Sequence, residues 1–191
     1  MKYFCILGVT FLILGRHYIM SNDTFHTIIL PLKDKLFRFA YSIVREQTEA
    51  EDITQDVLLK LWDKKELWNQ VENLEAYCFR TTRNMAIDRL ASMAIRKNER
   101  FEPEKEDLFF VDEHSPSHEM EHREQVALIE QSIDTLPDTQ KMVFRLREIE
   151  GLSYRNIAES LDISEDLVKI SLFRARKKIK ELLSGYHNNE Y

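Results

Sequence analysis

The chain has 191 residues, of which 43% are hydrophobic and 31% are charged, and its formal net charge at pH 7 is −6. This length fits one or two small domains. Gly and Pro number only four each, which is too few for an all-β fold with many turns. Long stretches rich in Leu, Glu, Lys, Arg and Ile run without either residue, and they predict an all-α protein.

The N-terminus carries a twelve-residue apolar run, YFCILGVTFLIL, at residues 3–14. A bilayer needs about 20 apolar residues, and no small-x-small cleavage site follows the run. We expect Met20 to be the initiator and residues 1–19 to be a mis-called extension; a weak membrane or export segment is the alternative. Cys5 and Cys78 lack CxxC spacing, so we expect no zinc ribbon or disulfide framework and a reduced, cytoplasmic protein.

Apolar spacing predicts two helices, at residues 31–44 and 48–62. Thr48 and Glu51 match a capping box at the start of the second helix. The apolar stripe of this second helix consists of Ala50, Ile53, Val57, Leu58, Leu61 and Trp62. The residues of this helix that lie outside the apolar stripe form either a solvated face or a surface for a partner protein. They are Asp52, Gln55, Asp56, Leu59 and Lys60.

A third helix is predicted to start at the cap residue Asn73 and to run through residue 94. Its expected stripe, at steps of three and four residues, is Leu74, Tyr77, Thr81, Asn84, Ile87 and Leu90. Aromatic residues lie beside arginines on this helix, an arrangement that suits base stacking combined with phosphate binding. The plainer interpretation is that Tyr77 and Phe79 are core residues.

Charge is distributed in blocks of opposite sign. Residues 80–100 and 164–180 each carry a net charge of +4, whereas residues 102–124 carry −7. The acidic segment is predicted to be a linker whose C-terminal end is already helical. Because its negative charge exceeds that of the whole chain, the net charge of the chain does not reveal the two basic blocks. One basic block alone usually marks a solvated face, but two on long helices favour nucleic-acid binding.

Residues 136–184 have the layout of a helix-turn-helix. Pro137 marks a helix entry, Gly151 a helix end, and Ser153 and Ser164 are candidate caps for the last two helices. Asp162 stands at the turn, where Gly is usual. On the last helix, Val168, Leu172, Ala175, Ile179 and Leu182 share the expected core face. The opposite face holds the candidates for the major groove and its phosphates: Asp166, Lys169, Ile170, Phe173, Arg174 and Lys177.

Three stretches, at residues 48–62, 76–91 and 136–179, together resemble a bacterial RNA polymerase sigma factor of the sigma-70 family. The similarity is to the short extracytoplasmic-function (ECF) group, which has only sigma domains 2 and 4. It implies domain 2 at residues 20–98, an acidic linker at 99–124 and a helix-turn-helix domain 4 at 125–191. The function implied is binding of core polymerase, promoter recognition, promoter melting and transcription initiation.

The resemblance also implies roles for single residues. The clamp helices of the polymerase's largest subunit would be bound by Asp52, Gln55, Asp56 and Leu59. The minus-10 promoter element would be melted and its flipped base captured by Tyr77, Arg80, Arg83, Asn84, Asp88 and Arg89. The minus-35 element would be read by the basic helix. An anti-sigma factor, which could be membrane-bound, is a further implied partner, whereas no cofactor or small-molecule substrate is implied.

Two other hypotheses remain open from the residues. A helix-turn-helix regulator that acts without being a polymerase subunit would explain residues 136–184 but not the first domain. An enzyme would need a reactive centre. His114, His118 and His122 are spaced by four like metal ligands, but Pro116 interrupts them, and we expect no metal site there and no catalytic residues.

Overall fold

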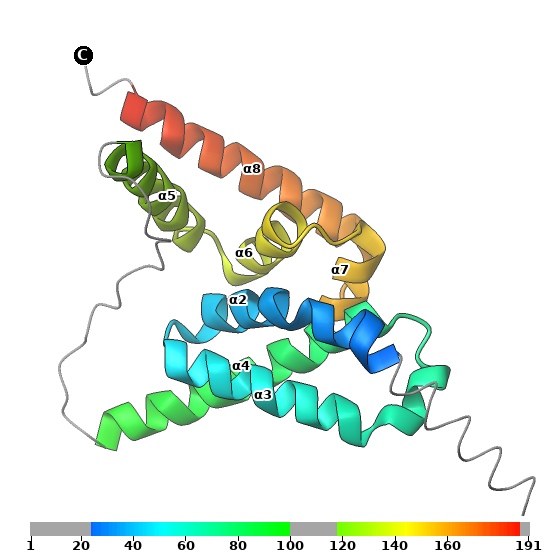
Figure 1. Cartoon of the computed structure of the whole chain (residues 1–191). Coiled ribbons are helices and arrows are strands. Elements are labelled where there is room, and N and C mark those ends of the chain that lie inside the picture. Colours follow the sequence, from blue (N-terminus) through cyan, green and yellow to red (C-terminus); the bar gives the residue numbers. More distant parts are fainter. Residues whose placement is uncertain (1–23, 100–117, 188–191) are drawn as a thin grey trace, which may run out of the picture. The chain divides into compact units, whose positions relative to one another are not determined.

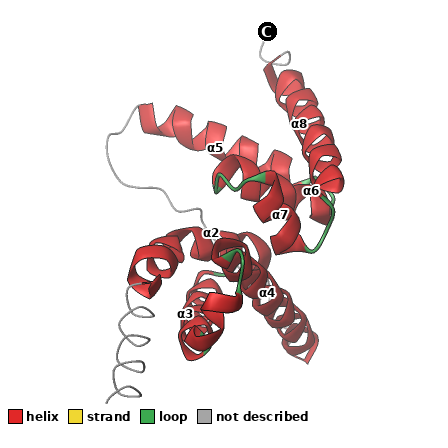
Figure 2. Cartoon of the chain, turned by 90° about the vertical axis from the view of Figure 1, so that its right-hand side faces the viewer, coloured by secondary structure: helices red, strands yellow, loops and turns green. Residues whose placement is uncertain are grey.

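The computed structural model of the chain describes residues 24–99 and 118–187, in which every regular element is a helix (Figure 1; Figure 2). The predictions for residues 1–19, for Cys5, for His114 and for most of the acidic segment lie outside the described residues. The chain divides into two compact units, with the boundary between residues 100 and 101. The predicted all-α class, with two small helical domains, is confirmed.

The first unit packs three long helices against one another. Its elements, in chain order, are η1 (Phe25–Ile29), η2 (Leu30–Leu32), α2 (Lys33–Val44), α3 (Gln47–Asp63), η3 (Lys65–Gln70) and α4 (Leu74–Glu99). Each of α2, α3 and α4 contacts the other two. Phe39 of α2 meets Phe79 of α4 edge to face, with ring centroids 5.6 Å apart, and both are buried. Phe79 is thus a core residue, as the plainer interpretation of the sequence held.

The start of α3 differs from the predicted capping box. Glu46 is the cap, and its carboxylate accepts hydrogen bonds from the backbone N–H groups of Thr48 (3.0 Å) and Glu49 (2.6 Å). Glu51 instead accepts a hydrogen bond from the side chain of Gln47. The prediction was wrong because Arg45 adopts a left-handed conformation (φ 57°), which ends α2 and lets α3 begin one residue earlier than Thr48.

The buried face of α4 also differs from the predicted stripe. Ile87 and Leu90 are 40% and 42% exposed, so they do not belong to the core. The buried residues of α4 include small and hydroxyl-bearing side chains, and together they are Ala76, Cys78, Phe79, Thr81, Thr82 and Ala86. The threonine hydroxyls donate to carbonyl oxygens one turn earlier in the same helix, at 2.8 and 3.0 Å, so their burial leaves no polar group unpaired. The predicted cap Asn73 is confirmed, since its side chain accepts from the N–H of Ala76.

The second unit is built around one long helix. Its elements are α5 (His118–Asp134), α6 (Asp138–Phe144), η4 (Arg145–Ile149), α7 (Tyr154–Leu161) and α8 (Glu165–His187). α5, α6 and α7 all pack against α8. One cluster of the core joins Ile133 and Leu136 to Ala175 and Ile179 of α8. The start of α5 at His118 confirms that the acidic segment ends in a helix.

The helix-turn-helix is confirmed in its details. The hydroxyls of Ser153 and Ser164 accept from the N–H groups of Asn156 (3.1 Å) and Leu167 (3.2 Å), as N-terminal caps do. Gly151 has a φ of 77° after the end of η4. Asp162 ends α7 in the left-handed conformation (φ 56°, ψ 50°), which is the geometry that favours Gly at this turn.

The buried thiol of Cys78 makes the stability of the first unit depend on pH. Burial, reinforced by the charge of Glu75, raises its pKa from 9.0 to about 12. Between these values the unfolded thiol loses its proton and the folded one keeps it, so the free energy of unfolding falls as pH rises.

We expect this fall to contribute up to about 1.4 kcal/mol per pH unit between pH 9 and 12. Urea unfolding of wild type and Cys78→Ala at several pH values in this window measures it. The alanine variant should start less stable, because it leaves a cavity, but should lose less stability with pH. Parallel pH profiles for the two proteins would contradict the prediction.

Candidate nucleic-acid interface

The burial of α8 separates its two faces clearly. Val168, Leu172, Ala175 and Ile179 are buried, as predicted, and Leu182 is partly buried. All six residues predicted for the opposite face are exposed, and Phe173 is 69% exposed although it is aromatic. Those six residues are Asp166, Lys169, Ile170, Phe173, Arg174 and Lys177. α8 therefore presents cations, apolar side chains and the carboxylate of Asp166 to solvent on one face.

Three charged contacts modify this surface. The longest places Lys177 Nζ 3.9 Å from a carboxylate oxygen of Glu181, one turn further along α8. Lys169 donates a hydrogen bond to Asp166 at 3.0 Å, and this contact raises the pKa of the lysine. Arg176 lies nearer the core side and donates to Glu148 of η4 at 2.5 and 3.1 Å, which raises its pKa. The basic block of residues 164–180 thus contains cations with different partners. The sequence carried no signal for the pair of Glu148 and Arg176, which are 28 positions apart.

The six residues predicted for the minus-10 element do not form one surface. At about 100° per residue, Tyr77, Arg80, Asn84 and Asp88 point to one side of α4. On this side Arg80 lies over the ring of Tyr77, 5.7 Å from its centroid. We call these four residues the outer face of α4. Arg83 lies at its margin and is half-buried.

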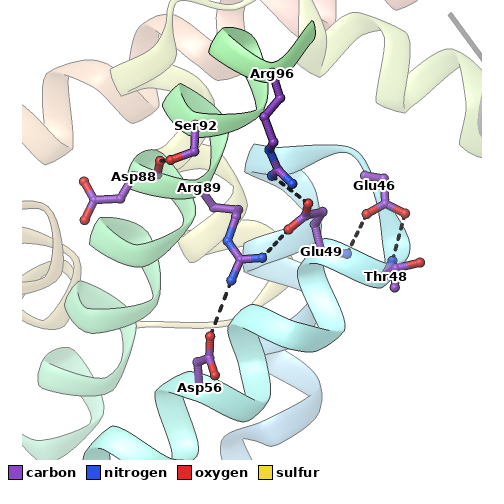
Figure 3. A network of polar contacts seen from close by, with 8 residues as sticks. All are labelled: Glu46, Thr48, Glu49, Asp56, Asp88, Arg89, Ser92 and Arg96. Atoms are coloured by element: carbon purple, nitrogen blue, oxygen red, sulfur yellow. Dashed lines mark hydrogen bonds and ion pairs between the residues drawn. The ribbon is translucent and has the colours of Figure 1, made fainter. Parts of the chain in front are cut away.

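Arg89 points away from the outer face, toward α3. Its guanidinium pairs with the carboxylate of Glu49 and lies 3.4 Å from that of Asp56 (Figure 3). Arg96, two turns further along α4, donates to the other oxygen of Glu49 at 3.0 Å. Figure 3 shows Asp88 directed away from this network. The sequence did not single out Glu49, because its partners lie 40 and 47 positions away.

The outer side of α3 carries the residues predicted to meet a partner protein. Asp52, Gln55, Asp56 and Leu59 are all exposed and recur at helical spacing. Leu59 is 62% exposed, which is high for a leucine in a packed unit. One apolar side chain among carboxylates gives this surface both hydrophobic and charged contacts to offer.

Two kinds of feature are absent from the described residues. Within residues 24–99 and 118–187, no group of three or more His, Cys, Asp or Glu side chains is arranged to hold a metal ion. In the same residues, no helix combines the length and apolar character needed to cross a membrane.

Two family models match the chain. The model for region 2 of sigma-70 matches residues 28–101, which contain the packed helices α2, α3 and α4. The model for region 4 of sigma-70 matches residues 127–179, which contain the helix-turn-helix. Together they match more than half of the chain, in the order that the resemblance implied.

Curated relatives match 70% or more of this chain. The RNA polymerase sigma-H factor of Pseudomonas aeruginosa is 26% identical over 169 residues, which cover 85% of this chain and 88% of the relative. The ECF RNA polymerase sigma-E factor of Haemophilus influenzae is 29% identical, covering 70% and 74%. The ECF RNA polymerase sigma factor SigM of Bacillus subtilis is 26% identical, covering 81% and 92%.

Solved structures share the fold. The sigma factor RpoE of Bartonella quintana, in complex with the anti-sigma factor NepR, aligns with a TM-score of 0.66 and 22% identity, covering 85% of this chain and 98% of that one. CnrH, in complex with the cytosolic domain of CnrY, aligns with a TM-score of 0.63 and 19% identity, covering 90% and 94%. The chain therefore belongs to the sigma-70 family of RNA polymerase sigma factors, in its extracytoplasmic-function group.

Proposed function

We propose that this protein binds core RNA polymerase and directs promoter recognition, melting and transcription initiation. The observation that carries the proposal is the pair of sigma-70 regions, 2 and 4, which occur in family order on two helical units. The proposed domains are residues 20–98 and 125–191, joined by the linker at 99–124. A regulator that acts without polymerase is the less favoured alternative, since it leaves region 2 without a role.

The exposed face of α8 would read the minus-35 element in the major groove. A helix fits this groove, and its outward side chains then reach base edges and phosphates. Arg174 and Lys177 are suited to phosphates or guanine, and Lys169 could join them by leaving Asp166. Ile170 and Phe173 are exposed apolar groups that can contact thymine methyls. Asp166 can accept from a cytosine amino group.

The outer face of α4 would meet unpaired bases of the minus-10 element. Tyr77 offers a ring for stacking, and Arg80 beside it adds a positive charge for the backbone. Asn84 and Asp88 supply hydrogen-bonding groups on the same side of the helix. A base that is flipped out of the duplex costs a few kcal/mol of unstacking, which such contacts can offset.

The outer side of α3 would bind the clamp helices of the largest polymerase subunit. Leu59 would supply apolar contact, and Asp52 would pair with a cation of the clamp. Asp56, of which one carboxylate oxygen lies 3.4 Å from Arg89, would offer its other oxygen to the clamp. Gln55 lies between them on the same face. We further propose that the protein is a cytoplasmic, non-enzymatic subunit without a cofactor, and that it is regulated by an anti-sigma factor, as RpoE is bound by NepR.

Replacing Leu59 by Ser should weaken binding to core polymerase about tenfold, because burial of a leucine contributes roughly 1.5 kcal/mol or more. The thermal stability of the Leu59→Ser variant should equal that of wild type, since the side chain of Leu59 is 62% exposed in the chain alone. Titration of labelled protein with core polymerase measures the affinity. Leu90→Ser, at an exposed leucine on α4, is the matched control and should bind normally. Wild type that fails to bind core polymerase, yet protects a palindrome alone, would favour the alternative.

Replacing Arg174 or Lys177 by Ala should weaken promoter binding by the holoenzyme. Each loss of a phosphate contact should lower the steepness of log affinity against log salt concentration by about 0.9. Arg176→Ala is the control, because that guanidinium already pairs with Glu148. Equal salt dependence in wild type and both test variants would show that α8 meets DNA elsewhere.

A further inference from the structure

We propose that Glu49 is a specificity-determining residue of region 2. Its carboxylate takes the place that a DNA phosphate would otherwise occupy between Arg89 and Arg96, and so lowers affinity for duplex DNA that lacks a promoter. The inference rests on the proposed DNA-binding function. It assigns Arg89 to this internal contact rather than to the minus-10 element.

The geometry of Glu49 resembles that of a phosphate held by two arginines. One carboxylate oxygen accepts from Arg89 and the other accepts from Arg96, at 3.0 Å for the latter (Figure 3). Guanidinium groups bind carboxylate and phosphate oxygens with the same planar donors. Arg89 and Arg96 are seven residues apart, about two turns, so they extend from the same side of α4.

Partial burial of Glu49 makes its contact with Arg89 less screened than a fully exposed ion pair. The side chain of Glu49 is 17% exposed, whereas those of Arg89 and Arg96 are 30% and 56% exposed. Salt and water screen exposed pairs strongly and shielded ones much less. The backbone N–H of Glu49 also donates to Glu46, which fixes the residue at the start of α3. A phosphate would therefore have to displace a carboxylate that the fold already holds in place.

The charges around the two arginines balance. Arg89 meets Asp56 as well as Glu49, so two guanidinium groups face two carboxylates. On the outer face of α4, by contrast, Arg80 lies over an aromatic ring. The net charge of +4 in residues 80–100 thus overstates the attraction of α4 for a phosphate backbone on the side of α3. Arg80 remains available on the outer face of α4, where bases are to be recognised. Duplex DNA of any sequence gains little binding energy from the side of α4 that faces α3.

The test is Glu49→Gln in holoenzyme reconstituted with core polymerase. Glutamine keeps the shape of the side chain and removes its charge, which leaves two arginines able to meet phosphates. Binding to a promoterless duplex, measured by fluorescence anisotropy over a range of salt, should become tighter. The slope of log affinity against log salt concentration should become steeper by about 1 to 2, according to whether one or both arginines contact phosphates. The preference for promoter over promoterless DNA should fall accordingly.

Glu51→Gln is the matched control, since Glu51 lies on the same helix and contacts Gln47 rather than an arginine. Equal effects of the two substitutions would mean a general charge effect and would overturn the proposal. A shallower salt dependence in Glu49→Gln would also overturn it, because Glu49 would then orient the arginines toward DNA. Addition of Arg89→Ala and Arg96→Ala to Glu49→Gln should abolish the gain.

The Arg89→Ala, Arg96→Ala double variant alone gives a second test that does not depend on how Glu49→Gln folds. Its salt dependence on promoterless DNA should match that of wild type, because both arginines are already neutralised. A drop by about 1 to 2 would overturn the proposal. Failure of wild type to bind core polymerase would instead refute the proposed function, so the two failures are distinguishable.

Discussion

Val168, Leu172, Ala175 and Ile179 lie buried along one side of α8, and their burial fixes the rotation of this helix about its axis. Because the helical period then dictates every other direction, the same four residues decide which cations face solvent. Phe79, Thr82 and Ala86 do the same for α4. In both units, the residues available to a nucleic acid or to polymerase are those on the helix faces that do not pack into the core.

The two basic blocks, which are alike in net charge, have different surroundings in the fold. On α8, Arg174 and Lys177 lie on the exposed face, and Arg176 is turned to Glu148. On α4, Arg89 and Arg96 meet acids of α3, and Arg80 pairs with an aromatic ring. This division fits the different tasks proposed for the two units. Region 4 would bind duplex DNA through cations exposed along α8, and region 2 would select unpaired bases by stacking on Tyr77 beside Arg80.

The face of α8 was predictable from sequence because apolar residues recur there at helical spacing without interruption. The face of α4 was not, because apart from Phe79 its core positions are alanine, cysteine and threonine, while Ile87 and Leu90 are exposed. Thr82 is polar by type but pairs with its own backbone, a compensation that periodicity does not reveal. Long-range ion pairs such as that of Glu49 with Arg89 leave no local pattern. The cap at Glu46 was missed because it depends on the left-handed backbone of Arg45.

Run-off transcription tests the central claim most directly. Core polymerase is mixed with the purified chain and with genomic fragments, and the start sites of the transcripts are mapped. Addition of the chain should produce transcripts from a set of sites that share minus-10 and minus-35 elements and that core polymerase alone does not use. A chain that neither joins core polymerase nor changes where transcription starts would contradict the assignment of a sigma factor.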